Sequence, residues 1–327
     1  MRKLVGFSLF FAVIVIVLGA YTRLTDAGLG CPDWPGCYGF LGIPKSEQAV
    51  ATAQARFPEA PYEYHKAWAE MVHRYAAGTL GLLVLAIAIV AYRARHNMPK
   101  QPLKLPFFLL AMIIFQAALG MWTVTLNLQP VIVMGHLLGG FTTLSLLYLL
   151  HLRLQRQQLM GTDEGMRKLR GLAKFALLVV VCQIALGGWV AANYAALACT
   201  ELPVCEGDWA NTLDFGGAFS VPAADTYQYG AHDYDDRMTM HVAHRIGALI
   251  TILVVGWLLL KGWLTARSRL LKRSLNFVAL MLVIQVALGL SNVIFMLPLS
   301  VAVAHNIVGA LLLLSMVGLN YNIARKA

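Results

Sequence analysis

The sequence predicts an all-α membrane protein in which eight transmembrane helices form two tandem, pseudo-two-fold-related four-helix bundles. The prediction comes from a low charge content, eight long apolar runs and an internal repeat. Of the 327 residues, 59% are hydrophobic and 13% are charged, whereas a soluble domain carries about 25% charged residues. Composition therefore assigns the chain to the membrane class before any motif is considered.

Each predicted helix is an apolar run of about 20 residues, the length that crosses the hydrocarbon core of a bilayer. The runs lie near residues 4–23, 71–91, 106–125, 132–152, 173–194, 241–260, 275–295 and 301–321. The first run resembles the apolar region of a signal peptide, but it is longer, and no small-residue cleavage site stands out before Tyr21. We therefore expect a first helix that is retained.

Basic residues lie mostly on one side of the predicted helices. Nineteen of the 26 Lys and Arg residues fall at the termini or in the second, fourth and sixth connections, and the positive-inside rule places that side in the cytoplasm. In the plasma (inner) membrane both termini are then cytoplasmic, and the long loops 24–70 and 195–240 are on the outer, periplasmic side. Orientation in the lipid bilayer explains the net charge of +10, so we expect no nucleic-acid partner, which would need a basic soluble surface.

The second half of the chain repeats the first at offsets between 168 and 171 residues. The matched segments are 72–74 with 243–245, 115–120 with 284–289, 135–140 with 304–309, and the pair Cys31 and Cys37 with Cys199 and Cys205. Four helices separate equivalent points, so the two copies have the same orientation, and an axis along the membrane normal should relate them. We predict an N-terminal half over 1–160 and a C-terminal half over 161–327.

Four of the nine histidines lie about one turn inside the outer ends of predicted helices, and each half has two. They are His73 and His136 in the N-terminal half and His244 and His305 in the C-terminal half. Ionisable groups in a membrane are costly and usually functional, imidazole is an axial ligand of heme iron, and a four-helix bundle can hold such a cofactor. A helix–helix hydrogen bond remains an alternative for any single histidine, whereas four histidines in two bundles do not form one tetrahedral metal site.

The residues around these histidines add weaker signals. Arg74 and Arg245 each follow a histidine, where a guanidinium group could pair with heme propionates or reach lipid headgroups. Glycines near the first pair, among them Gly78 and Gly81, would let a flat macrocycle approach the backbone, although glycine also permits close helix packing. The other histidines singled out, which are His65, His96, His151 and His232, are expected to be solvated or interfacial.

The two halves differ at one position beside the histidines. Glu70 precedes His73 by three residues and shares its helical face, whereas His241 stands at the equivalent position before His244. A carboxyl group at a heme edge can move protons or stabilise developing charge. The asymmetry favours a functional Glu70, because two identical electron-transfer hemes would not require it.

Two cysteine pairs lie in the outer loops with matched spacing. Because that compartment is oxidising, we expect the disulfides Cys31–Cys37 and Cys199–Cys205. Neither pair belongs to a Cys-x-x-Cys-His motif, so covalent heme attachment is not indicated. The fifth cysteine, Cys182, lies in a predicted helix and is expected to pack in the core.

The chain resembles the heme A synthase family over nearly its whole length. The segment 21–35 resembles the first outer-loop signature of that family, and Glu70-x-x-His73-Arg74 resembles its catalytic helix. His136, His244-Arg245 and His305 complete the pattern. The segment 61–69 departs from the simplest bacterial pattern and is nearer to members with a longer first outer loop.

The resemblance implies an oxidoreductase that oxidises the C8 methyl of heme O to a formyl group, by successive hydroxylations and loss of water, to give heme A. It implies that His73 and His136 hold the substrate heme O, that His244 and His305 hold a heme b cofactor, and that Glu70 is an essential acid. The implied partners are heme O synthase, the cytochrome oxidase assembly machinery and an unidentified electron donor. The source of the oxygen atom, the role of the cysteines in turnover, and homo-oligomer formation stay open.

Two other functions also account for paired histidines in a membrane bundle. A diheme quinol cytochrome would hold two equivalent, permanently bound hemes and would not depend on Glu70. A heme carrier or chaperone would bind heme reversibly and leave the porphyrin unchanged. Heme analysis after coexpression with heme O synthase distinguishes these functions from heme A synthesis.

Overall fold

The computed structural model describes residues 1–95, 102–155 and 163–326. All regular elements in these ranges are helices, which confirms the predicted all-α class. The predicted interfacial His96 and the predicted boundary between residues 160 and 161 lie outside the described residues. Two of the basic residues used to orient the chain, Lys100 and Arg156, lie outside them as well.

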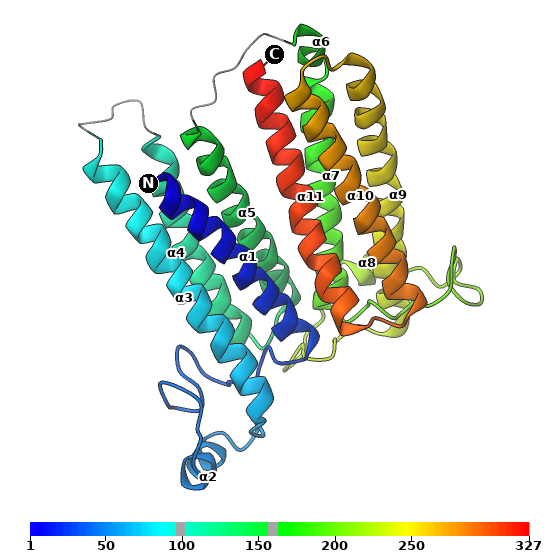
Figure 1. Ribbon diagram of the computed structural model, residues 1–327. Coiled ribbons are helices and arrows are strands. Elements are labelled where there is room, and N and C mark those ends of the chain that lie inside the picture. The colour runs from blue at the N-terminus through cyan, green and yellow to red at the C-terminus, as the bar shows by residue number, and fades with distance from the viewer. Residues whose placement is uncertain (96–101, 156–162, 327) are drawn as a thin grey trace. The chain divides into compact units, whose positions relative to one another are not determined.

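Within the described part of the chain, eight helices are long and apolar enough to cross a membrane (Figure 1). They are α1 (Arg2–Leu24), α3 (Tyr64–Arg93), α4 (Lys104–Thr125), α5 (Pro130–Leu154), α7 (Arg170–Ala192), α9 (Tyr234–Thr265), α10 (Arg269–Ile294) and α11 (Leu299–Lys326). Each overlaps one predicted apolar run, so the prediction of eight spans is confirmed. The chain is a multi-pass membrane protein.

Two of the long helices begin seven residues before the apolar runs that predicted them. The helix α3 begins at Tyr64 rather than near 71, and α9 begins at Tyr234 rather than near 241. Their extra turns are polar, and in α9 the side chain of Asp233 caps the helix by accepting the main-chain N–H of Asp236. The extensions place Glu70 and His241 inside helices rather than at their edges.

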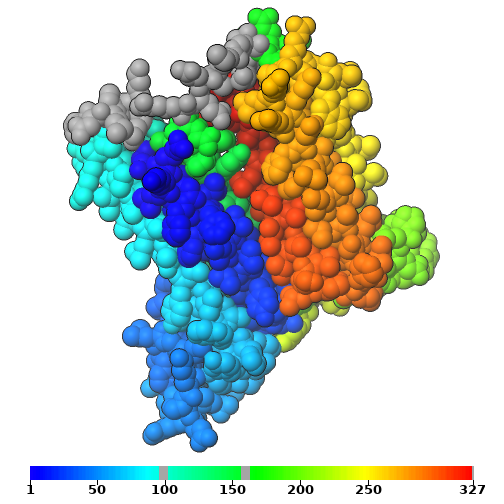
Figure 2. Space-filling view, viewed as in Figure 1, coloured from blue at the N-terminus to red at the C-terminus, as the bar shows by residue number. Residues whose placement is uncertain are grey.

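Among the residues that the structure describes, three short helices lie in the connections and were not predicted. They are α2 (Glu47–Arg56), α6 (Glu164–Arg167) and α8 (Phe215–Ala218). The helix α2 is capped by Ser46, whose hydroxyl accepts the N–H of Ala49 at 3.2 Å. Figures 1 and 2 show α2 and its flanking loops beyond the N-terminal end of α3. The first long loop is therefore folded rather than extended.

A small core holds this first long loop together. Its buried members are Cys31, Cys37, Tyr38, Ile43, Ala53, Ala67 and Met71. Because Ala67 and Met71 belong to α3, the loop packs onto the same helix end that carries Glu70. The loop therefore has a fixed position over the first histidine pair.

The chain divides into two compact units, which are described separately. The first contains residues 3–143 and 221–231, and the second contains 144–220 and the described residues from 232 onward. In the first unit, the N–H of Tyr227 donates to the carbonyl of Asn127 at 2.9 Å, and Asn127 donates to the carbonyl of Asp225 at 2.8 Å. Part of the second long loop thus packs on the turn between α4 and α5.

The backbone conformation also shows the internal repeat. Asn127 and Leu128, in the turn before α5, have φ values of 49° and 63°. Met296 and Leu297, 169 residues later, have φ values of 56° and 59°. Such left-handed conformations are uncommon outside glycine, so their recurrence at matched positions supports two copies of one unit.

Candidate heme site

The first histidine pair lies on α3 and α5 of the first unit. The ring centroids of His73 and His136 are 6.4 Å apart, with the ring planes at 88°. A ligating imidazole nitrogen lies about 2 Å from its metal, so two rings on opposite sides of one ion have centroids about 6 Å apart. The observed separation therefore fits a single metal between two axial imidazoles.

The second pair lies on α9 and α11 of the second unit. His244 and His305 are close enough to interact electrostatically. Both are contacted by glutamine carboxamides, from Gln183 at 3.0 Å and from Gln285 at 3.2 Å. Each unit thus brings together the two histidines that its sequence predicted as a pair.

Each of the four imidazole rings packs against a glycine of the neighbouring helix. A Cβ atom added at the glycine would lie within 2.9 to 3.2 Å of the ring carbon Cε1. The pairs are Gly19 with His73, Gly120 with His136, Gly187 with His244, and Gly289 with His305. Sequence reasoning missed Gly19 and Gly187 in this role, although their repeat offset of 168 residues was a usable signal. No atom lies within 4 Å of a Cβ at Gly78 or Gly81, so these two do not contact the rings.

The polar atoms around the rings fit a heme. Among the described residues, Nδ1 of His73, His136 and His305 is buried without a hydrogen bond of good geometry. The main chains of Val15, Gln116 and Gln285 lie beside the respective rings. A neighbouring backbone carbonyl is the usual partner of the imidazole nitrogen that does not bind the metal. Paired imidazoles in an apolar bundle are a donor set that heme iron accepts.

Glu70 is buried near the N-terminal end of α3, with 4% of its surface exposed. Its Oε2 atom accepts the main-chain N–H of Cys31 at 2.8 Å, and its Oε1 atom pairs with the guanidinium group of Arg74. The carboxylate is therefore fixed between its own helix and the first disulfide loop. One turn of helix separates it from His73.

His241 occupies the matching position in the second unit and is equally buried, at 5% exposure. Its Nδ1 atom lies 3.1 Å from the carbonyl oxygen of Ala195, so a protonated Nδ1 donates to the loop. The carboxylate of Glu70 instead accepts a hydrogen bond from the loop. The hydrogen bond between this position and the loop therefore runs in opposite directions in the two units.

Arg74 and Arg245 both hold the disulfide loop of their own unit. Arg74 donates to the carbonyls of Asp33 at 2.9 Å and Gly36 at 2.6 Å. Arg245 donates to the carbonyls of Glu201 at 2.8 Å and Cys199 at 2.9 Å. Sequence reasoning did not anticipate this loop-binding role. A propionate-binding role for either guanidinium group stays a prediction.

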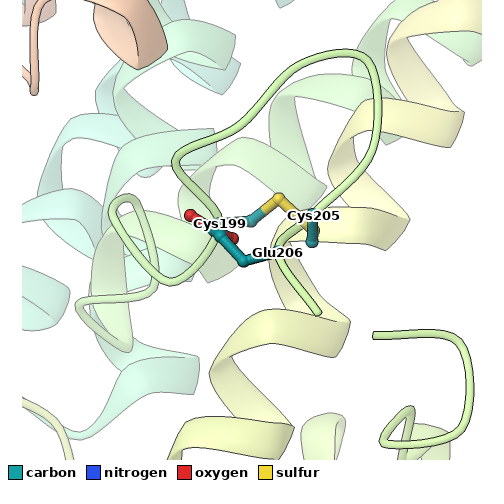
Figure 3. A group of neighbouring side chains, drawn as sticks. All are labelled: Cys199, Cys205 and Glu206. Atoms are coloured by element: carbon teal, nitrogen blue, oxygen red, sulfur yellow. A yellow bond between two sulfur atoms is a disulfide. The ribbon is translucent and has the colours of Figure 1, made fainter. Parts of the chain in front are cut away.

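Both predicted disulfides are present, with S–S distances of 2.02 Å for Cys31–Cys37 and 2.04 Å for Cys199–Cys205. Figure 3 shows Glu206 beside the second disulfide. Disulfide sulfur is not the thiolate that binds metals, so this group is not a metal site. Hydrogen bonds from Thr200 lower the pKa of Glu206, and they tie this acid to the loop.

Two predictions about single residues were wrong. Cys182 does not pack in the core, because it lies on an exposed face of α7. His232 is not solvated, since its side chain is buried and its Nδ1 atom lies 2.7 Å from the carboxylate of Asp236. His65 is exposed and His151 is half-buried, as expected for interfacial histidines.

Comparison with known proteins shows the family of the chain. The model of the cytochrome oxidase assembly protein family matches residues 2–317. A heme A synthase of Shewanella oneidensis is 49% identical and covers 99% of this chain and 97% of its own length. Heme A synthases of Caulobacter vibrioides and Rhizorhabdus wittichii are 28% and 27% identical and cover 94% and 95% of this chain and 90% and 91% of their own lengths. The chain therefore belongs to the cytochrome oxidase assembly protein family.

Proposed function

We propose that the chain is an oxidoreductase that converts heme O to heme A. The C8 methyl group would be oxidised to a formyl group by successive hydroxylations and loss of water. The observation that carries the proposal is the 49% identity to a heme A synthase over nearly the full length of both chains. The histidine pairs and the buried Glu70 supply the groups that this chemistry requires.

The two histidine pairs take different hemes in this proposal. His73 and His136 hold the substrate heme O in the N-terminal half, residues 1–160. His244 and His305 hold heme b in the C-terminal half, residues 161–327, where a bound heme b supplies one-electron transfer. The centroid distance of 6.4 Å between the first two rings supports a shared metal.

Glu70 is the proposed catalytic acid of the substrate half. Its burial excludes bulk water, and Arg74 balances the charge of the carboxylate. The N–H of Cys31 orients Oε2, so the carboxyl group can take up or release a proton at a fixed position. His241 provides no carboxylate at the matching position, which restricts this chemistry to one half.

The proposal also includes the orientation and partners of the chain. Both termini lie in the cytoplasm, and the long loops lie on the outer side of the plasma membrane, as the distribution of basic residues indicates. Heme O synthase supplies the substrate, and the cytochrome oxidase assembly machinery receives the product. The reaction also requires an oxygen source with the matching redox partner: dioxygen, which serves as the oxidant together with an electron donor, or water together with an electron acceptor.

One observation favours a second candidate, a diheme electron-transfer cytochrome. Both units present a histidine pair with the same glycine packing, which two equivalent hemes would require. That function leaves no catalytic role for the buried Glu70. It is therefore the second choice.

Coexpression with heme O synthase tests the proposed function. Hemes extracted from the purified chain and from membranes are separated by chromatography, and heme A is the expected product. Intact chain that contains only heme b and unmodified heme O would contradict the proposal. Heme b alone, in equal amounts at both sites, would favour the cytochrome.

A further inference from the structure

Three of the four histidines are contacted by a glutamine that lies one turn before the glycine beneath the ring. The side chain of Gln116, in α4, donates to the carbonyl of His136. Gln183, in α7, lies 3.0 Å from both the carbonyl and Nδ1 of His244. Gln285, in α10, lies 3.2 Å from Nε2 of His305. Each carboxamide therefore links a histidine to the neighbouring helix.

Glycines on the histidine helices make room for these carboxamides. A Cβ atom at Gly139 would overlap the side-chain oxygen of Gln116, and one at Gly247 would overlap that of Gln183. At Gly309 it would lie 3.4 Å from the carboxamide nitrogen of Gln285. Each of the three histidines is thus followed, about one turn later, by a glycine against which the glutamine packs.

His73 is the exception in both respects. The repeat places Val15 at the position of Gln183, and a valine side chain forms no hydrogen bond. It also places Ala76 at the position of Gly247, so the room for a carboxamide is absent where the carboxamide is absent. The glutamine and the glycine are thus both replaced at His73. The paired change indicates a different packing arrangement around this ring rather than a single isolated substitution. His73 keeps the glycine contact, from Gly19, and the neighbouring main chain of Val15.

We propose that Gln116, Gln183 and Gln285 are positioning residues that fix three heme ligands. His73, which has no such glutamine, is then the ligand that releases the heme when substrate and product exchange. A resident heme needs two firmly held ligands. In the second unit Gln183 contacts the carbonyl and Nδ1 of His244, and Gln285 packs between Gly309 and the ring of His305. A substrate heme must enter and its product must leave, and the first unit holds only His136 in this way. The inference rests on the proposed function for the assignment of the exchanging heme to the first unit.

The test installs the missing glutamine and measures heme release. The double variant Val15→Gln/Ala76→Gly supplies both the carboxamide and its space, and Val15→Met/Ala76→Gly is the matched control of similar size without the hydrogen bond. The full chain, coexpressed with heme O synthase and purified in detergent, is mixed with excess apomyoglobin as the heme acceptor. Chromatography of the retained hemes follows heme O and heme A separately from heme b.

The glutamine variant should release heme O and heme A about fivefold more slowly than its methionine control, the factor that corresponds to about 1 kcal/mol for one hydrogen bond. Heme b should be retained equally by both, which also shows that both variants fold. Equal release rates in the two variants would overturn the inference. Heme A production by the unmodified chain decides the proposed function separately: equal release rates beside normal production would overturn only the inference, and no production by the unmodified chain would remove only the proposed function.

A second arm removes a glutamine from the other unit. Gln183→Met should speed the release of heme b and shift its midpoint potential and its low-spin absorption spectrum, because the ring loses a hydrogen-bonding neighbour. A purely structural role would lower the thermal stability of the protein without moving the spectrum. An unchanged potential and spectrum in a stable Gln183→Met protein would contradict the positioning role.

Discussion

Glu70 is the residue on which the two units differ most in chemistry. Its carboxylate is buried, is paired with Arg74 and accepts the N–H of Cys31. Replacement by glutamine keeps the shape and removes the charge and the proton-transfer capacity. We expect Glu70→Gln to lower heme A formation by about 100-fold or more, the usual contribution of a general acid or base.

The matched control for this prediction is His241→Gln, which changes the equivalent position in the other unit. Both variants are compared by chromatography of the hemes that accumulate in membranes and by the heme b content of the purified chain. Glu70→Gln should retain heme b and accumulate heme O. Normal heme A formation by this variant would remove the assigned role of Glu70 while leaving the family membership intact.

The glycines beneath the rings lead to a second prediction at the residue scale. A methyl group at Gly187 would lie 3.0 Å from Cε1 of His244, closer than packed carbon atoms approach. Gly187→Ala should therefore cost about 1–3 kcal/mol through overpacking and should reduce bound heme b. Gly171→Ala, in the same helix with no atom within 4 Å, is the control. Thermal unfolding in detergent and heme content are measured together, and equal behaviour of the two variants would exclude the contact as a constraint.

Among the elements, the first long loop is a small folded segment that packs on α3. Tyr38 is 1% exposed within it, and its hydroxyl donates to the carbonyl of Pro61 at 3.0 Å. Burial and the negative charge of Glu63 raise the pKa of Tyr38 to about 12. The folded loop therefore favours the protonated phenol.

This shift predicts that the loop loses stability at alkaline pH. A tyrosine ionises near pH 10 in an unfolded chain, so the contribution of Tyr38 is complete below about pH 10 and is lost as pH rises toward about 12. Ultraviolet titration of tyrosinate should show a late-ionising tyrosine that is missing in Tyr38→Phe. Protection of the loop from protease should fall over the same pH range in the native chain. A native titration curve equal to that of the Phe variant would contradict the prediction.

The elements also show what hydropathy could and could not predict. All eight long helices were predictable, because an apolar run of bilayer length with few charges rarely forms anything but a spanning helix. The polar first turns of α3 and α9 were not predictable. Their helical state depends on capping by Asp233 in α9 and on packing against the first long loop in α3. The exposed Cys182 and the buried His232 were misjudged for a related reason, because residue type alone does not say which side chains the fold covers.

At the scale of the whole molecule, the internal repeat predicted more of the candidate site residues than any single motif did. It paired the four histidines, both cysteine bridges and the Glu70–His241 difference from the residue order alone. It did not single out the glycine beneath each ring or the glutamine beside it, because those contacts join helices whose relative rotation the sequence does not state. Once the contacts are known, the same offsets relate Gln183 to Val15 and reveal the exception.

The orientation of the whole chain is a prediction that reporter fusions can test. The excess of Lys and Arg at the termini and in alternate connections predicts a cytoplasmic C-terminus and outer long loops. Alkaline phosphatase, which is active only outside the cytoplasm, should be active when fused after residue 58 and inactive when fused to the C-terminus. Green fluorescent protein should give the opposite pattern. Alkaline phosphatase activity at the C-terminal fusion would invert the topology and place the disulfide loops in the reducing cytoplasm, where disulfides are rarely stable.

The division of labour between the two units is the prediction that involves the whole molecule. If the first unit holds substrate and the second a resident heme, His73→Ala should abolish heme A formation while the purified chain keeps its heme b. His244→Ala should remove heme b and abolish heme A formation as well, because the substrate half then lacks its electron supply. His65→Ala, which changes an exposed histidine in the first turn of α3, is the control and should retain both hemes. Chromatography of extracted hemes and reduced absorption spectra distinguish these cases. Loss of heme b from a stable His73→Ala protein would show that the two pairs do not act separately, and the assignment of substrate and cofactor to different units would then be wrong.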